Sequence, residues 1–125
     1  MARILIIDDD ESVRSLLSEV FMSLDPKHEI FTAVDGLEGV LAAKKELPDV
    51  IITDVDMPNM NGYGVCKQLR IDPRTMKIPI LMLTGKNDLT GAIEGMRYGA
   101  DDHITKPFNV DEVAARLQAL LLRGR

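Results

Sequence analysis

Acidic side chains gather at two points of this sequence where they could bind a metal ion or attack a phosphorus atom. Asp8, Asp9 and Asp10 form an unbroken run, and Asp54 and Asp56 stand two residues apart. Carboxylates that meet in a partly desolvated cleft repel one another, so a cation has to offset their charge. A hard divalent ion does this, and Mg²⁺ prefers a few carboxylates together with water and phosphate oxygens.

A hydroxyl and an ammonium group stand at two further points of the chain. Thr84 precedes Gly85, and Lys106 precedes Pro107. With a divalent ion present, a carboxylate oxygen can act as a nucleophile on phosphorus and form an aspartyl phosphate. Lys106 would offset charge on the transferred group, and Thr84 would hydrogen-bond one of its oxygens. These residues predict phosphoryl-transfer chemistry if the fold brings them together.

Short apolar runs rich in Ile and Val precede these groups and predict strands. We expect buried strands at Ile4–Ile7, Val50–Thr53 and Ile78–Leu83, and weaker ones at Glu29–Val34 and Asp102–Thr105. Between the strands, helical patterns predict five helices, which we place at Val13–Leu24, Leu37–Leu47, Gly62–Arg70, Leu89–Tyr98 and Val110–Leu121. Asp10 is interpreted as the cap of the first helix rather than as a metal ligand.

Regular alternation of strand and helix predicts an α/β fold. Five parallel strands would be joined by right-handed crossovers into a doubly wound sheet with helices on both faces. Ligands of such sheets bind at the carboxyl ends of the strands. Asp8, Asp54, Thr84 and Lys106 each follow or end a predicted strand. Acids from two strands, a hydroxyl from a third and an ammonium group from a fourth would therefore meet at one edge.

Length and composition restrict the class of protein. A chain of 125 residues fits one domain, residues 1–125. The net charge of −5 argues against direct binding of nucleic acid, which needs clustered Lys and Arg. The single cysteine, Cys66, excludes an internal disulfide and is expected to pack in a helix. The N-terminus lacks a signal-peptide pattern and no apolar run approaches the ~18 residues of a membrane span, so we expect a cytoplasmic location without membrane contact.

Over nearly its whole length the sequence resembles the response-regulator receiver domain of two-component signalling, of the chemotaxis-regulator kind. Each matching segment is a weak signal alone, but together, in this order and spacing, they are specific: Ile4–Asp10, Asp54–Gly62, Leu83–Gly85, Gly99–Asp101 and Lys106–Phe108. The resemblance implies one receiver domain over residues 1–125. It also implies five parallel strands in the flavodoxin-like order 2-1-3-4-5 with five helices.

The resemblance also implies a role for each acidic residue. Asp54 would accept the phosphoryl group and would also be a ligand of the metal ion. Asp9 would bind Mg²⁺ directly, and Asp8 would assist through a water molecule. The backbone carbonyl of Asp56 would be a third protein ligand of the ion.

Three further residues would respond to phosphorylation, again by resemblance. Lys106 would pair with the phosphoryl group, and its bond to Pro107 is usually cis in the family. Thr84 would move toward the group and couple it to the outer face. The switch position on the last strand usually holds Tyr or Phe and here holds His103, which is smaller and can become charged. His103 is either a strand residue packed at the sheet edge or a rotamer switch.

The leading functional hypothesis is a signalling module that catalyses only its own phosphorylation and dephosphorylation. A sensor histidine kinase or phosphotransfer protein would supply the phosphoryl group, and an output domain or target protein would read the conformational change. One alternative is a haloacid-dehalogenase-type phosphohydrolase, since Asp54 and Asp56 have its spacing, but its nucleophile follows the first strand. Another is a flavodoxin-like electron carrier, but the acidic run after the first strand would repel its phosphate.

Overall fold

The computed structural model describes residues 1–85, 93 and 95–123. Within them, five parallel strands form one sheet in the order β2-β1-β3-β4-β5. The strands are β1 (Arg3–Ile7), β2 (Glu29–Ala33), β3 (Val50–Asp54), β4 (Ile80–Thr84) and β5 (Asp102–Thr105). The predicted doubly wound, flavodoxin-like sheet is confirmed.

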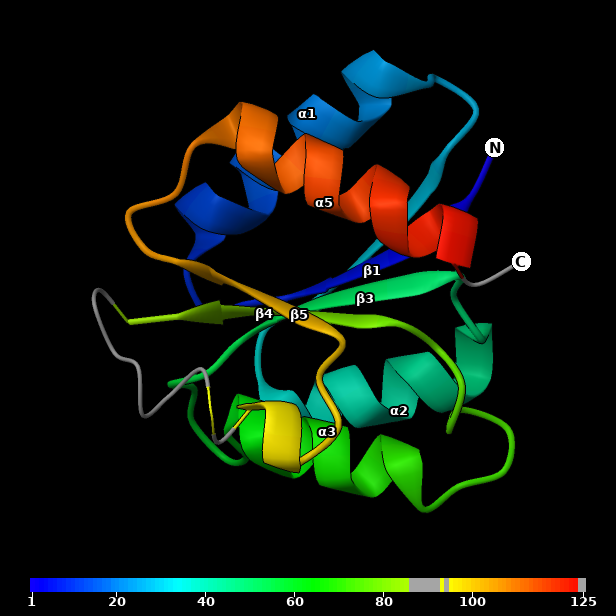
Figure 1. The fold of residues 1–125 in the computed structure, drawn as a ribbon, viewed down its shortest axis with the longest axis vertical. Coiled ribbons are helices and arrows are strands. Elements are labelled where there is room, and N and C mark those ends of the chain that lie inside the picture. Colours follow the sequence, from blue (N-terminus) through cyan, green and yellow to red (C-terminus); the bar gives the residue numbers. More distant parts are fainter. Residues whose placement is uncertain (86–92, 94, 124–125) are drawn as a thin grey trace.

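Helices cover both faces of the sheet (Figure 1). The described helices are α1 (Glu11–Leu24), α2 (Gly36–Glu46), α3 (Gly62–Arg70) and α5 (Val110–Arg123). In Figure 1, α1 and α5 lie on one side of the sheet, and α2 and α3 lie on the other. The predicted helix Leu89–Tyr98 falls largely outside the described residues, of which Ile93 and residues 95–97 are helical. No helix in the described part of the chain is both long and apolar enough to cross a membrane.

Two apolar cores result from this layering, one on each side of the sheet. Leu17 and Phe21 of α1 pack with Leu117 of α5 against one face of the strands. On the other face the core includes Cys66 and Leu69 of α3. Burial raises the pKa of the Cys66 thiol to about 12, so this cysteine packs as a small apolar residue.

The central strands are buried because both faces of the sheet are covered. Every residue of β3 and β4 is buried, which explains why these segments appear in the sequence as unbroken apolar runs. In register, Ile7 pairs with Thr53, Asp54 pairs with Leu83, and Thr84 pairs with Thr105. The carboxyl ends of β1, β3, β4 and β5 therefore lie along one edge of the sheet.

Polar caps start the helices that follow these strands. Asp10 caps α1, and its side chain accepts a hydrogen bond of 2.8 Å from the backbone N–H of Ser12, as predicted. Asp35 caps α2 and Asn61 caps α3 in the same way. Asn109 accepts from the N–H of Asp111 at the start of α5. The cap at Asp10 starts α1 directly after Asp8 and Asp9, whereas a loop of residues 55–61 separates β3 from α3.

Candidate phosphoacceptor and metal site

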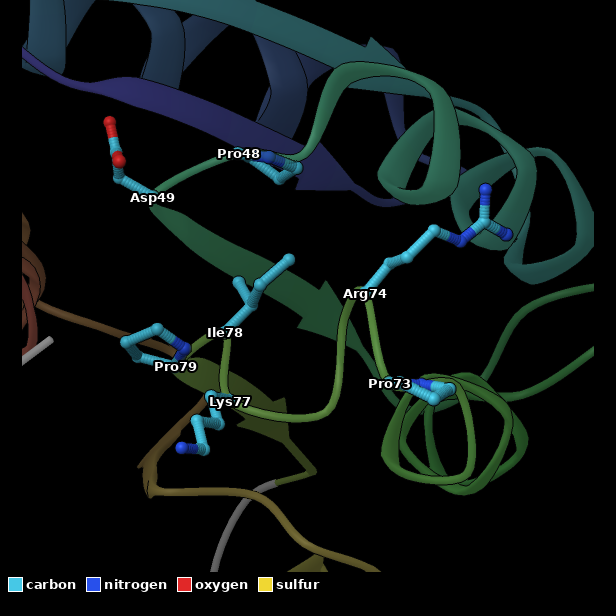
Figure 2. Close-up of a pocket in the computed structure, with 7 residues that line it drawn as sticks. All are labelled: Pro48, Asp49, Pro73, Arg74, Lys77, Ile78 and Pro79. Carbon is cyan, nitrogen blue, oxygen red and sulfur yellow. The ribbon is translucent and has the colours of Figure 1, made fainter.

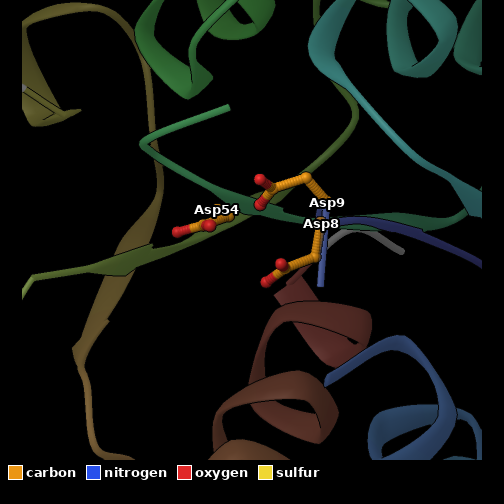
Figure 3. A group of neighbouring side chains, drawn as sticks. All are labelled: Asp8, Asp9 and Asp54. Atoms are coloured by element: carbon orange, nitrogen blue, oxygen red, sulfur yellow. The ribbon is translucent and has the colours of Figure 1, made fainter. Parts of the chain in front are cut away.

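Three carboxylates meet at the carboxyl edge of the sheet. Asp8 and Asp9 follow β1, and Asp54 is the last residue of β3. Their side chains converge on one space (Figure 3), and one oxygen from each lies within 4.8 Å of the others. They form the candidate cluster for a metal ion among the described residues. The structure thus brings together acids from two strands, as the sequence predicted.

The ammonium group of Lys106 lies between two of these carboxylates. Its Nζ is 3.4 Å from Oδ2 of Asp8 and 3.2 Å from Oδ1 of Asp54. Lys106 directly follows β5, and its backbone N–H donates to the carbonyl of Thr84 at 2.8 Å, which fixes its place beside β4. The peptide bond between Lys106 and Pro107 is cis.

The two acids in contact with Lys106 are buried, and burial shifts the pKa of each. The side chain of Asp8 is 0% exposed and that of Asp54 is 12% exposed. Burial raises the pKa of Asp8, opposed by the N–H of Asp10 and by Lys106. Burial, followed by repulsion from Asp8, raises the pKa of Asp54, opposed by Lys106 and the N–H of Val55. Both carboxyl groups are therefore costly to keep ionised in this site.

Lys106 compensates only part of the negative charge. Burial lowers the pKa of its ammonium group, but Asp54 and Asp8 outweigh this effect and the net shift is upward. Three carboxylates and one ammonium group leave two negative charges uncompensated. A divalent cation would compensate these two negative charges, and the all-oxygen donor set suits a hard ion. The cluster therefore fits a hard divalent metal ion.

Asp56 lies in the loop between β3 and α3 and is exposed. Its carboxylate is outside the cluster of three acids found among the described residues. The resemblance assigned the backbone carbonyl of Asp56 to the ion, and that role stays a prediction. The loop returns to β3 where α3 begins, because a Cβ atom on Gly62, the first residue of α3, would overlap the backbone carbonyl oxygen of Asp54.

The two predicted switch residues lie on neighbouring strands. Thr84 is buried at the end of β4, and its hydroxyl donates a long hydrogen bond of 3.5 Å to the carbonyl of Ile104. His103 is half-buried in β5, where it pairs in register with Met82. Its backbone N–H donates to the carboxylate of Asp102 at 2.8 Å. Movement of either side chain stays a prediction.

Asn59, which follows Asp54 by five residues, was not among the site residues predicted from the sequence. Its side-chain amide donates a hydrogen bond of 2.7 Å to Oδ2 of Asp35. Asn59 also has a backbone φ of 68°, in the left-handed region that Asn tolerates better than most residues. The only local signal was its position in the turn Asn59-Met60-Asn61, because its partner lies 24 residues earlier.

A separate hollow lies at the opposite edge of the sheet (Figure 2). Its lining comes from residues just before β3 and β4 and from the segment after α3: Pro48, Asp49, Pro73, Arg74, Lys77, Ile78 and Pro79. Because Asp54 ends the strand that this hollow precedes, the hollow is not part of the carboxylate cluster.

Comparison with known proteins agrees with this geometry. Residues 4–118 match the family model of the response regulator receiver domain. The chain is 44% identical over 124 residues to the DNA-binding dual master transcriptional regulator RpaA of Synechocystis sp., covering 98% of the chain and 50% of that protein. It is 43% identical over 123 residues to the alkaline phosphatase synthesis transcriptional regulatory protein PhoP of Bacillus subtilis, covering 98% and 49%. The chain thus spans about half the length of these curated relatives.

Solved structures show the same architecture. The chemotaxis response regulator CheY4 of Vibrio cholerae superposes with a TM-score of 0.87 at 38% identity, covering 96% of this chain and 98% of that one. The receiver domain of the Francisella response regulator 1452 superposes with a TM-score of 0.88 at 28% identity, covering 100% of both chains. The chain belongs to the response regulator receiver domain family, whose members are signalling modules rather than conventional enzymes.

Proposed function

We propose that this domain is the phosphoacceptor of a two-component system and that Asp54 takes the phosphoryl group. The donor would be a phosphohistidine on a sensor histidine kinase or a phosphotransfer protein. The observation that carries the proposal is the contact of the Asp54 carboxylate with Lys106, beside Asp8 and Asp9, at the carboxyl edge of the sheet.

The carboxylates of Asp8, Asp9 and Asp54 and the carbonyl of Asp56 would hold Mg²⁺, with Asp8 acting through water. When bound, the ion would offset the negative charge of these acids and of the phosphoryl oxygens. The two uncompensated charges of the cluster support this assignment.

In the proposed transfer, an oxygen of Asp54 forms a bond to phosphorus while the phosphorus–nitrogen bond of the donor breaks. The electron pair of that bond returns to the imidazole ring of the donor. Lys106 pairs with a phosphoryl oxygen and stabilises the charge on the transferred group. Thr84 hydrogen-bonds another phosphoryl oxygen. Asp54 pairs in register with Leu83 on the neighbouring strand, and Thr84 is the next residue toward the carboxyl edge.

The phosphoryl group would then shift an equilibrium between two conformations, because Thr84 and Lys106 contact it in only one of them. Thr84 and His103 would carry the change to the outer face of β4 and β5. The relatives named above include transcriptional regulators about twice as long as this chain. By that similarity, phosphorylation of this domain would control a transcriptional output, with the acidic domain itself making no direct contact with DNA.

The first test is phosphorylation by a small donor. Incubation with Mg²⁺ and acetyl phosphate or phosphoramidate should add one phosphoryl group, measured by intact mass spectrometry. Asp54→Ala should take none, and neither should the wild type after chelation of the metal. Asp111→Asn, which changes an exposed acid of α5, is the matched control and should react normally. Equal labelling of wild type and Asp54→Ala would contradict the proposal.

A further inference from the structure

The loop between β3 and α3 is held at two points. At its base, the N–H of Gly62 donates to the carbonyl of Val55 at 2.8 Å. Away from its base, the amide of Asn59 donates to Asp35, the residue that precedes α2. The first bond closes the loop on itself, and the second ties it to a different element. Asp56 lies between these two points.

The acceptor in this second bond is itself fixed. Oδ1 of Asp35 accepts a hydrogen bond of 2.8 Å from the N–H of Glu38, and Oδ2 accepts the 2.7 Å bond from Asn59. The N–H of Glu38 and then the amide of Asn59 hold the pKa of Asp35 below its usual value. The acceptor is therefore an ionised carboxylate, and hydrogen bonds to a charged acceptor are stronger than neutral ones.

Close packing of the backbone accompanies the hydrogen bond. A Cβ atom on Gly36 would overlap the carbonyl of Met60, so the loop rests directly on the first turn of α2. Glycine at position 36 permits this approach, and Asn59 tolerates the left-handed backbone that directs its amide toward Asp35.

We propose that Asn59 and Asp35 are positioning residues for the metal site, because their hydrogen bond holds the loop that carries the Asp56 carbonyl. The inference rests on the proposed function, since Asp56 is a ligand only if Mg²⁺ binds beside Asp54. Mg²⁺ requires near-octahedral geometry with oxygens at about 2.0–2.1 Å, so a small displacement of one ligand lowers its affinity. Residues that orient metal ligands affect affinity without touching the ion.

Two variants that keep the net charge separate the hydrogen bond from general effects. Asn59→Gly removes the amide donor and accepts the positive φ without strain. The double exchange Asp35→Asn with Asn59→Asp reverses donor and acceptor, so that the new amide can donate to the new carboxylate. Asn caps helices as well as Asp does, so the exchange also preserves the start of α2.

The experiment is calorimetric titration of the whole chain with Mg²⁺ at low temperature, with thermal unfolding measured in parallel to show that each variant is folded. Asn59→Gly should bind Mg²⁺ roughly tenfold more weakly, at the lower end of the effect of losing an orienting partner. The double exchange should bind close to the wild-type value. Rescue by the exchanged pair is a result that loss of loop stability alone does not give.

Different results would overturn different claims. If wild type neither binds Mg²⁺ nor takes a phosphoryl group at Asp54, the proposed function fails and this inference fails with it. If wild type does both and Asn59→Gly binds Mg²⁺ as tightly, only the positioning role is wrong. If Asn59→Gly is weak and the double exchange is equally weak, the hydrogen bond is not the cause and the positioning role is also wrong.

Discussion

At the scale of single residues, the site depends on an ammonium group held between two buried carboxylates. Lys106 forms ion pairs with both Asp8 and Asp54. Its ammonium group therefore competes with a metal ion for these two carboxylates. The sequence predicted these three residues at the same edge because each follows a predicted parallel strand. It could not give their mutual distances, which depend on the register of strands far apart along the chain.

Replacement of this lysine tests its two roles separately. Lys106→Ala should bind Mg²⁺ roughly fivefold more tightly, a change of about 1 kcal/mol for loss of a partly exposed competing ion pair. Phosphorylation of the variant should no longer produce the conformational change, because the contact with the phosphoryl group is gone. Calorimetry measures the first effect, and amide chemical shifts before and after phosphorylation measure the second. Lys27→Ala, in an exposed loop, is the control. If phosphorylation changed the amide chemical shifts of Lys106→Ala as much as those of the wild type, the assignment would be refuted.

At the scale of elements, the sequence predicted the strands and helices well and their ends less well. The run Ile78–Leu83 predicted a strand, but β4 is Ile80–Thr84. Pro79 has no N–H for the ladder, and the carbonyl of Ile78 instead accepts from the Arg70 side chain. α1 begins at Glu11 rather than Val13, because its cap fixes the start while the apolar pattern begins later. The contact of Asn59 with Asp35 joins two polar loop residues, which no periodic pattern reveals.

Arg70, at the end of α3, holds several connections together. Its guanidinium donates to the carbonyls of Met76 and Ile78 at 3.1 and 2.8 Å, before β4. It also donates to the carbonyl of Gly99 at 3.0 and 2.8 Å and pairs with Asp101 at 2.9 Å, before β5. The planar fork of Arg permits these simultaneous bonds, and a Lys ammonium does not reproduce them.

Loss of these bonds should destabilise the domain. Arg70→Ala should lower the free energy of unfolding by about 2–3 kcal/mol, because several backbone carbonyls lose their donor. Arg70→Lys should recover less than half of that loss. Urea unfolding at pH 7 measures both, with Lys67→Ala on the exposed side of the same helix as the control. Wild-type stability of Arg70→Lys would show that charge rather than the forked geometry is what matters.

At the scale of the whole molecule, function opposes stability at one edge of the sheet. The strands bring several acids to that edge, and burial raises the pKa of Asp8 and Asp54. A carboxyl group with a raised pKa binds its proton more tightly in the folded state than in the unfolded state. Its contribution therefore lowers the free energy of unfolding as pH rises through the range above its usual pKa.

Neutralising the more buried acid should relieve this cost. Without Mg²⁺ at pH 7, Asp8→Asn should raise the free energy of unfolding by about 1 kcal/mol, because an incompletely compensated buried charge is removed. The gain should shrink as pH is lowered from 7 toward the ordinary pKa of an aspartic acid, because the raised pKa of Asp8 lets the folded wild type take up a proton before the unfolded chain does. Urea unfolding in the presence of a chelator, at pH 7 and at a series of lower pH values, checks this, with Asp111→Asn as the control. A loss of stability at pH 7 in Asp8→Asn would contradict the electrostatic explanation.

The central claim is that Asp54, among several neighbouring acids, is the residue that forms the acyl phosphate. Borohydride reduces an acyl phosphate to the alcohol, which marks the modified position permanently. After phosphorylation with Mg²⁺ and reduction, peptide mass mapping should find homoserine at position 54, with Asp8, Asp9 and Asp56 intact. Reduction at one of those three acids, or at no acid of the chain, would contradict the account.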